Sequence, residues 1–138
     1  MIVLDTNVVS ETQKPKPNAR VMAWLDDQVA ETLYITAISY SEILVGIEML
    51  AEGKRKRGLS AGMAEVLEHS FASRILAFDR NAAVEYARIY ARTRKSGTLS
   101  MADAQIAAIA AAHGFAVGTR DVDPFRAAGV KVINPWEL

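Results

Sequence analysis

The chain contains no cysteine among its 138 residues, and this absence excludes several kinds of chemistry. Without thiols the protein can form no disulfide, no zinc–thiolate site and no thiol nucleophile. The absence is also compatible with a reducing compartment, so we expect a cytoplasmic location. Stability must come from an apolar core, and a chain of this length buries about two thirds of the surface that its unfolded form exposes.

Net charge and long apolar runs are missing as well. Lys plus Arg and Asp plus Glu total 16 each, so no overall field attracts or repels a polyanion, and any nucleic-acid surface must be local. No segment reaches the ~18 uncharged apolar residues of a membrane span, and Asp5 interrupts the first apolar run too early for a signal peptide. We therefore expect no membrane partner.

Short apolar segments alternate with amphipathic ones along the chain, without repeats or linkers, which predicts a single domain over residues 1–138. Strands are expected at Ile2–Leu4, Leu33–Thr36, Arg74–Asp79, Phe115–Thr119 and Val130–Ile133. Helices are expected after a cap at Asn18, over about Ile38–Leu50, around Met63–Phe71, from a cap at Asn81 to Gly97, and from Ser100 to Gly114. This alternation is typical of an α/β fold with a parallel sheet covered on both faces.

Acidic residues follow two of the expected strands. Asp5 comes directly after the first strand, and Asp121 lies two residues past the fourth. Either residue alone is more typical of a turn or a helix cap. However, both belong to the carboxyl edge of the sheet, where open α/β sheets bind their ligands at a topological switch point.

Asp103 is a third acid with two possible roles. With Ser100 as the N-cap residue, Asp103 falls three positions into a helix, close to a capping box. Helical spacing also places Asp103 on one stripe with Ile106 and Ala107, the side expected to face the sheet. The start of this helix should lie beside Asp5.

Glu42 is the fourth candidate, one turn into the helix that follows the second strand. It falls opposite the main apolar stripe, between Ile38, Val45 and Met49, so we expect this helix to be buried on two sides. A buried carboxylate needs a partner. A metal ion and an Arg from elsewhere in the fold are the two alternatives.

Four acids at one sheet edge would repel one another unless a cation keeps them ionised. Oxygen ligands without Cys or His nearby suit Mg²⁺ or Mn²⁺ better than zinc. Such a site activates water and binds the negative oxygens of a phosphodiester. The pattern therefore predicts metal-dependent hydrolysis of phosphodiester bonds.

Five segments in the right order resemble the PIN-domain nucleases, specifically the VapC toxins of bacterial type II toxin–antitoxin systems and their FitB-like branch. The similarity extends over essentially the whole chain. The segments are MIVLDTNVVSE with Asp5, YITAISYSEILVGI with Glu42, SMADAQIAAIA with Asp103, VGTRDVDPF with Asp121, and the closing VINPW.

The resemblance implies a three-layer α/β/α sandwich with a five-stranded parallel sheet, a homodimer, and RNA cleavage that depends on Mg²⁺ or Mn²⁺. The acids that it assigns to the catalytic site are Asp5, Glu42, Asp103 and Asp121. Asp5 and Asp103 are its metal ligands, while Asp121 ligates directly or through water. Thr6, Asn7 and Thr119 match positions that shape the site. The implied partner is a small DNA-binding antitoxin that covers the site and, together with the toxin, binds operator DNA.

Other interpretations remain open at this point. The basic run Lys54–Arg57 suits either an RNA backbone or a solvated loop between helices, and Arg120 is better placed to meet a phosphate. An aspartyl-phosphate phosphatase would use Asp5 as nucleophile, but it needs a second Asp where this chain has Asn7. A non-enzymatic interaction module would use the acids to receive an Arg from a partner protein.

Overall fold

Five parallel strands form the centre of the molecule in a computed structural model that describes residues 1–97 and 99–138. The strands lie in the order β3-β2-β1-β4-β5. Their bounds are β1 Ile2–Leu4, β2 Leu33–Thr36, β3 Ile75–Leu76, β4 Ala116–Gly118 and β5 Val132–Ile133. The expected parallel sheet is confirmed, although β3 is much shorter than the predicted Arg74–Asp79.

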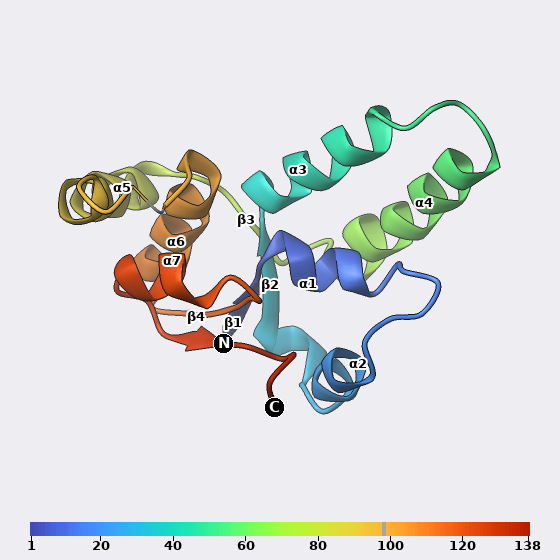
Figure 1. The fold of residues 1–138 in the computed structure, drawn as a ribbon, viewed down its shortest axis with the longest axis horizontal. Helices are drawn as coiled ribbons and strands as arrows, with labels where there is room; N and C mark the ends of the chain where they lie inside the picture. Colours follow the sequence, from blue (N-terminus) through green and yellow to red (C-terminus); the bar gives the residue numbers. More distant parts are fainter. Residues whose placement is uncertain (98) are drawn as a thin grey trace.

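Helices cover both faces of this sheet, which confirms the three-layer sandwich (Figure 1). One face packs against α5 (Arg80–Thr93), α6 (Met101–His113) and α7 (Val122–Ala127). The other packs against α1 (Thr6–Glu11), α2 (Ala19–Asp26), α3 (Ala37–Glu48), α4 (Lys54–Ala64) and the π-helical segment η2 (Glu65–Ser70), and a 3₁₀ turn, η1 (Ala30–Thr32), precedes β2. No helix among the described residues is long and apolar enough to cross a membrane.

The alanine-rich helix α6 lies deep in the first core. Four of its alanines are each less than 5% exposed, namely Ala104, Ala107, Ala108 and Ala110. Small side chains let this helix lie close to the sheet and to α5, and Ile106 and Ile109 fill the remaining space. Gly114 ends the helix in the left-handed conformation, at φ 71°.

Helix starts follow the expected capping chemistry, with one correction. The Asn18 side chain accepts hydrogen bonds from the amides of Arg20 and Val21, as predicted. The predicted cap of α5 at Asn81 is wrong, because Asp79 has the extended cap conformation and accepts from Ala82. Asn81 therefore lies inside the first turn.

Three segments differ from the sequence expectation. The short helices α1 and α7 follow β1 and β4 directly, where no helix was predicted. The basic run Lys54–Arg57 is not a loop, because it forms the first turn of α4. Lys and Arg are good helix formers, and Lys56 also pairs with Glu52 at 2.6 Å.

Candidate active site

The strand order places a topological switch point between β1 and β4. The chain passes from β1 to β2 on one side, while β4 and β5 lie on the other side. The amide of Asp5 donates to the carbonyl of Gly118 at 2.9 Å, so Asp5 and Thr119 come off neighbouring strand ends. This edge is where ligands bind in open α/β sheets.

Asp5 is fixed by hydrogen bonds to both of its carboxylate oxygens. It caps α1, since Oδ1 accepts from the Thr6 amide at 2.8 Å. The Thr119 hydroxyl donates to Oδ2 at 2.8 Å. Asp5 is only 4% exposed and Thr119 is fully buried, so the pair forms the floor of the site.

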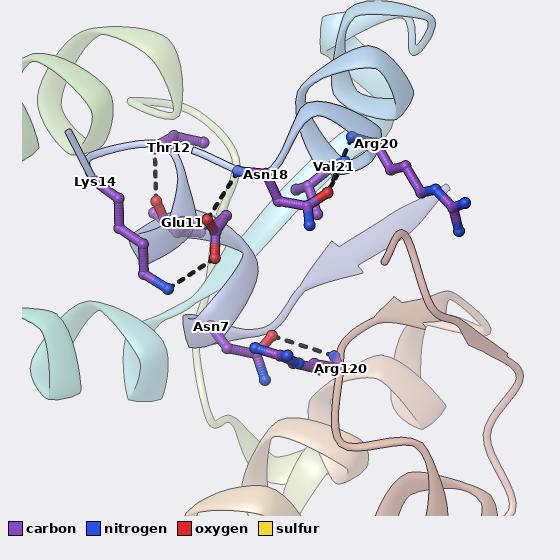
Figure 2. Close-up of polar contacts among 9 residues, drawn as sticks. Asn7, Glu11, Thr12, Lys14, Asn18, Arg20, Val21 and Arg120 are labelled. Carbon is purple, nitrogen blue, oxygen red and sulfur yellow. Dashed lines mark hydrogen bonds and ion pairs between the residues drawn. The ribbon is translucent and has the colours of Figure 1, made fainter. Parts of the chain in front are cut away.

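Asn7 links the two strand ends through its side-chain amide. Its Nδ2 lies 3.4 Å from Asp5 Oδ2 and 3.3 Å from both Thr119 Oγ1 and Asp121 Oδ2. Its Oδ1 accepts from the amide of Arg120 at 3.4 Å, the contact drawn in Figure 2. Asn7 thus donates toward two carboxylates, which argues against the phosphatase alternative because that mechanism needs an acid here.

Glu42 joins the site through Thr6. The Thr6 hydroxyl donates to Glu42 Oε1 at 2.8 Å and lies 3.0 Å from the Ser39 hydroxyl. The expectation that Glu42 is buried is wrong, because its side chain is exposed on α3. Ile38 in the first turn packs against the α6-side core, but beyond it the helix packs on one side only. Its other side leaves Leu44, Val45 and, just past the helix end, Met49 exposed.

Asp103 is half-buried at the start of α6. Its amide donates to the Ser100 hydroxyl at 3.1 Å, so the predicted cap at Ser100 is confirmed. Its carboxylate is close enough to the site that its charge acts on Asp5. The structure thus brings all four predicted acids to the same sheet edge.

Burial and repulsion from neighbouring acids raise the pKa values of two of the four, Asp5 and Asp103. Burial raises the pKa of Asp5 to about 6, against the opposing hydrogen bonds from Thr119 and Thr6, and the charges of Asp103 and Glu42 raise it further. Burial likewise raises the pKa of Asp103, and the charges of Asp121 and Glu42 add to the shift. Metal-free Asp5 therefore loses its proton at a clearly higher pH than an ordinary Asp.

The residues fit a hard divalent cation in donor type and charge. In the part of the chain that the structure describes, no three Asp, Glu or His side chains lie close enough together to form a ready-made metal site. Asp5 is instead engaged by hydrogen bonds. However, the donors are all oxygen, and a cation would relieve the repulsion that raises the pKa values of Asp5 and Asp103.

Two polar residues near the site were missed by sequence reasoning. Ser39 is fully buried, and its amide donates to the hydroxyl of Thr36, the cap of α3. The threonine three positions before this serine is a capping signal that the sequence already contains.

The second missed residue is Glu11, the last residue of α1. It is 4% exposed and accepts from the Asn18 amide at 3.0 Å and from Lys14 Nζ at 2.9 Å (Figure 2). The hydrogen bonds from Lys14 and Asn18 lower the pKa of this carboxyl. Glu11 ties the connection between α1 and α2 to the back of the site.

The family is decided by a match of residues 2–131 to the PIN domain. The chain belongs to the PIN-domain family. Across 99% of both chains, it is 49% identical to plasmid stability protein StbB of Pseudomonas syringae pv. tomato and 46% identical to VapC ribonuclease Y4jK of Sinorhizobium fredii. It is also 44% identical to toxin FitB of Neisseria gonorrhoeae, with the same coverage.

Solved structures of PIN-domain proteins share the whole architecture. The complex of FitAB with an IR36 DNA fragment contains a chain that superposes with a TM-score of 0.93 at 45% identity, covering 100% of this chain and 97% of the other. The five-stranded fold and the resemblance to VapC and FitB proteins are thereby confirmed.

Proposed function

We propose that this PIN-domain protein is the toxin of a type II toxin–antitoxin system and acts as a metal-dependent endoribonuclease. The observation that carries the proposal is the gathering of Asp5, Glu42, Asp103 and Asp121 at the β1–β4 switch point, where Asp5 and Asp103 have raised pKa values. Full-length relatives named VapC ribonuclease and toxin FitB support it.

Each acid has a distinct role in this proposal. Asp5 and Asp103 would hold a Mg²⁺ or Mn²⁺ ion, and Thr119 keeps the Asp5 carboxylate oriented through its hydrogen bond. When bound, the cation supplies a water of lowered pKa and neutralises charge on the phosphate. Asp121 would ligate the ion directly or through water.

The remaining chemistry is hydrolysis of one phosphodiester bond. Asp121 and Glu42 orient the attacking water and accept its proton. The water oxygen bonds to phosphorus as the bond to the 3′ oxygen breaks. A proton then passes to that oxygen, which leaves a 3′ hydroxyl and a 5′ phosphate.

The proposal includes partners. A cognate DNA-binding antitoxin covers the acidic site, and operator DNA is bound only through the complex, as the DNA-bound FitAB structure supports. The protein itself is a homodimer, which the exposed apolar side chains of Val45 and Met49 on α3 support. Its RNA substrate places the protein in the cytoplasm.

Cleavage by the antitoxin-free protein tests the activity. We expect RNA to be cut with Mg²⁺ or Mn²⁺, to stay intact in EDTA, and to stay intact with folded Asp5→Ala or Asp103→Ala. Unchanged cleavage by either folded variant would rule out the assigned site. Metal binding and operator binding without any nuclease activity would favour the interaction module instead.

A further inference from the structure

A polar cleft of about 450 Å³ opens beside Asp121, between the segment that follows β4 and the turn that follows β5. Its volume lies in the range of about 300–1,000 Å³ that is typical of ligand sites. The polar residues that line it are Arg120, Asp121, Asp123, Arg126, Asn134 and Glu137. The cleft thus begins at one of the proposed catalytic acids and offers both hydrogen-bond donors and acceptors.

Arg120 is held at both its backbone and its side chain. Its amide donates to Asn7 Oδ1 (Figure 2), and its guanidinium lies 5.3 Å from the ring centroid of Trp136. This distance is typical of a cation–π contact. Among residues 1–97 and 99–138, no carboxylate lies within 4.0 Å of the guanidinium as an ion pair. The charge of Arg120 helps to lower the pKa of the buried Glu11, but no ion pair among the described residues holds the guanidinium away from a ligand.

The closing segment of the chain fixes Trp136 in this position. Asn134 Oδ1 accepts from the Trp136 amide at 3.0 Å, and the Asn134 carbonyl accepts from the Glu137 amide at 3.2 Å. Trp136 is half-buried and packs against the core on the α2 side of the sheet. The turn therefore presents an aromatic face to Arg120 from a rigid support.

We propose that this cleft binds one nucleotide of single-stranded RNA next to the bond that is cut. Arg120 contacts a backbone phosphate, and Trp136 is a positioning residue for Arg120. Arg suits this task because its planar guanidinium binds phosphate oxygens in pairs. The inference rests on the proposed ribonuclease function and specifies its substrate.

The acids in the same cleft can act as hydrogen-bond acceptors for the uncharged parts of a nucleotide. Asp123 and Glu137 would repel an isolated phosphate, but they can accept hydrogen bonds from a base or a ribose hydroxyl. Proteins that read RNA sequence bind unpaired bases, whose edges are accessible. The cleft therefore favours an unpaired strand over a duplex.

Binding of a fluorescent oligoribonucleotide in EDTA tests the site separately from cleavage. We expect Arg120→Gln to weaken binding about tenfold or more and to reduce the slope of log affinity against log salt by about 0.7. Arg20→Gln is the matched control, because Arg20 is exposed on α2 and its backbone amide bonds to Asn18 (Figure 2). It should bind like the wild type.

Two further variants show whether a loss of RNA affinity comes from the position and shape of the Arg120 side chain or from a folding defect. Arg120→Lys should keep the salt slope while losing part of the affinity, because it keeps the charge but not the planar group. Trp136→Phe should weaken binding when Arg120 is present and have no added effect in Arg120→Gln.

The proposal would be overturned if Arg120→Gln bound RNA as tightly as Arg20→Gln does. It would also be overturned if the wild type bound single-stranded and duplex RNA with equal affinity. If the wild type binds RNA through Arg120 but cuts none with metal, the nuclease function fails and this site stands.

Discussion

Opposing effects act on the carboxylate of Asp5. Burial and the neighbouring acids favour its protonated form, while the hydrogen bonds from Thr6 and Thr119 favour the ionised form. The sum leaves a pKa of about 6, above the ordinary value near 3.8. Without a cation, ionised Asp5 therefore lowers the stability of the fold, as expected of a side chain that binds a ligand rather than one that only packs.

Replacing Asp5 by Asn should raise the free energy of unfolding of the metal-free protein at pH 8 by about 1–3 kcal/mol. Because the folded pKa is raised, the cost of ionised Asp5 develops as pH rises from about 4 to about 6 and is fully present above that. Urea unfolding at pH 4 and pH 8 measures it, with exposed Asp26→Asn as control. A gain that is equal at both pH values would contradict the account.

Thr119→Val should raise the pH midpoint of Mn²⁺ binding. The variant removes the hydroxyl that lowers the pKa of Asp5 and leaves the amide of Asp121 without its acceptor. We also expect the free energy of unfolding to fall by about 1–3 kcal/mol. Thr119→Ser restores the hydroxyl, so identical pH midpoints for the Val and Ser variants would refute this role.

The short helix α1 begins at the acidic site and ends at Glu11, which binds the segment that leads to α2. Asp5, Thr6 and Asn7 form its start, and Glu11 at its end accepts hydrogen bonds from the segment that leads to α2 (Figure 2). A shift in that segment would therefore reach Asp5, Thr6 and Asn7 through one short helix.

Glu11→Ala should destabilise the protein by about 1–3 kcal/mol, because it leaves the half-buried Asn18 amide without an acceptor. Glu11→Gln keeps an acceptor for Asn18 and should cost less. Thermal unfolding of the two variants gives the comparison. Wild-type stability of Glu11→Ala would show that these hydrogen bonds contribute nothing.

Element prediction from sequence succeeded where periodicity extends over several turns. The long helices α3 and α6 and all five strand positions were found, whereas α1 and α7, with six residues each, are too short for a periodic signal. The helical start at Lys54 was missed because four basic residues suggest a solvated loop. The exposure of α3 was missed because apolar residues on two sides of a helix do not reveal which side packs.

At the level of the whole molecule, the site joins residues that are far apart in the chain. Asn7 and Asp121 are 114 positions apart and meet at 3.3 Å only because β1 and β4 are neighbours. The edge was predictable from the rule for parallel sheets. The bridging roles of Asn7 and Thr6 were not, since hydrogen-bond partners depend on side-chain directions that spacing does not fix.

We propose that residues 1–138 unfold as one domain. The two cores lie on opposite faces of the same sheet and share its central strands. Fluorescence of Trp24 and Trp136, which pack against one core, should therefore change together with far-UV circular dichroism in a single urea transition. Two separated transitions would contradict a single cooperative unit.

Calorimetric titration of Mn²⁺ into the antitoxin-free protein tests whether the acids at the β1–β4 edge form a cation site. Such a site predicts saturable binding to the wild type and to the exposed-acid control Asp26→Asn, and loss of binding in Asp5→Asn and in Asp103→Asn. Wild-type affinity in both of the last two variants, with their folds intact by circular dichroism, would contradict it.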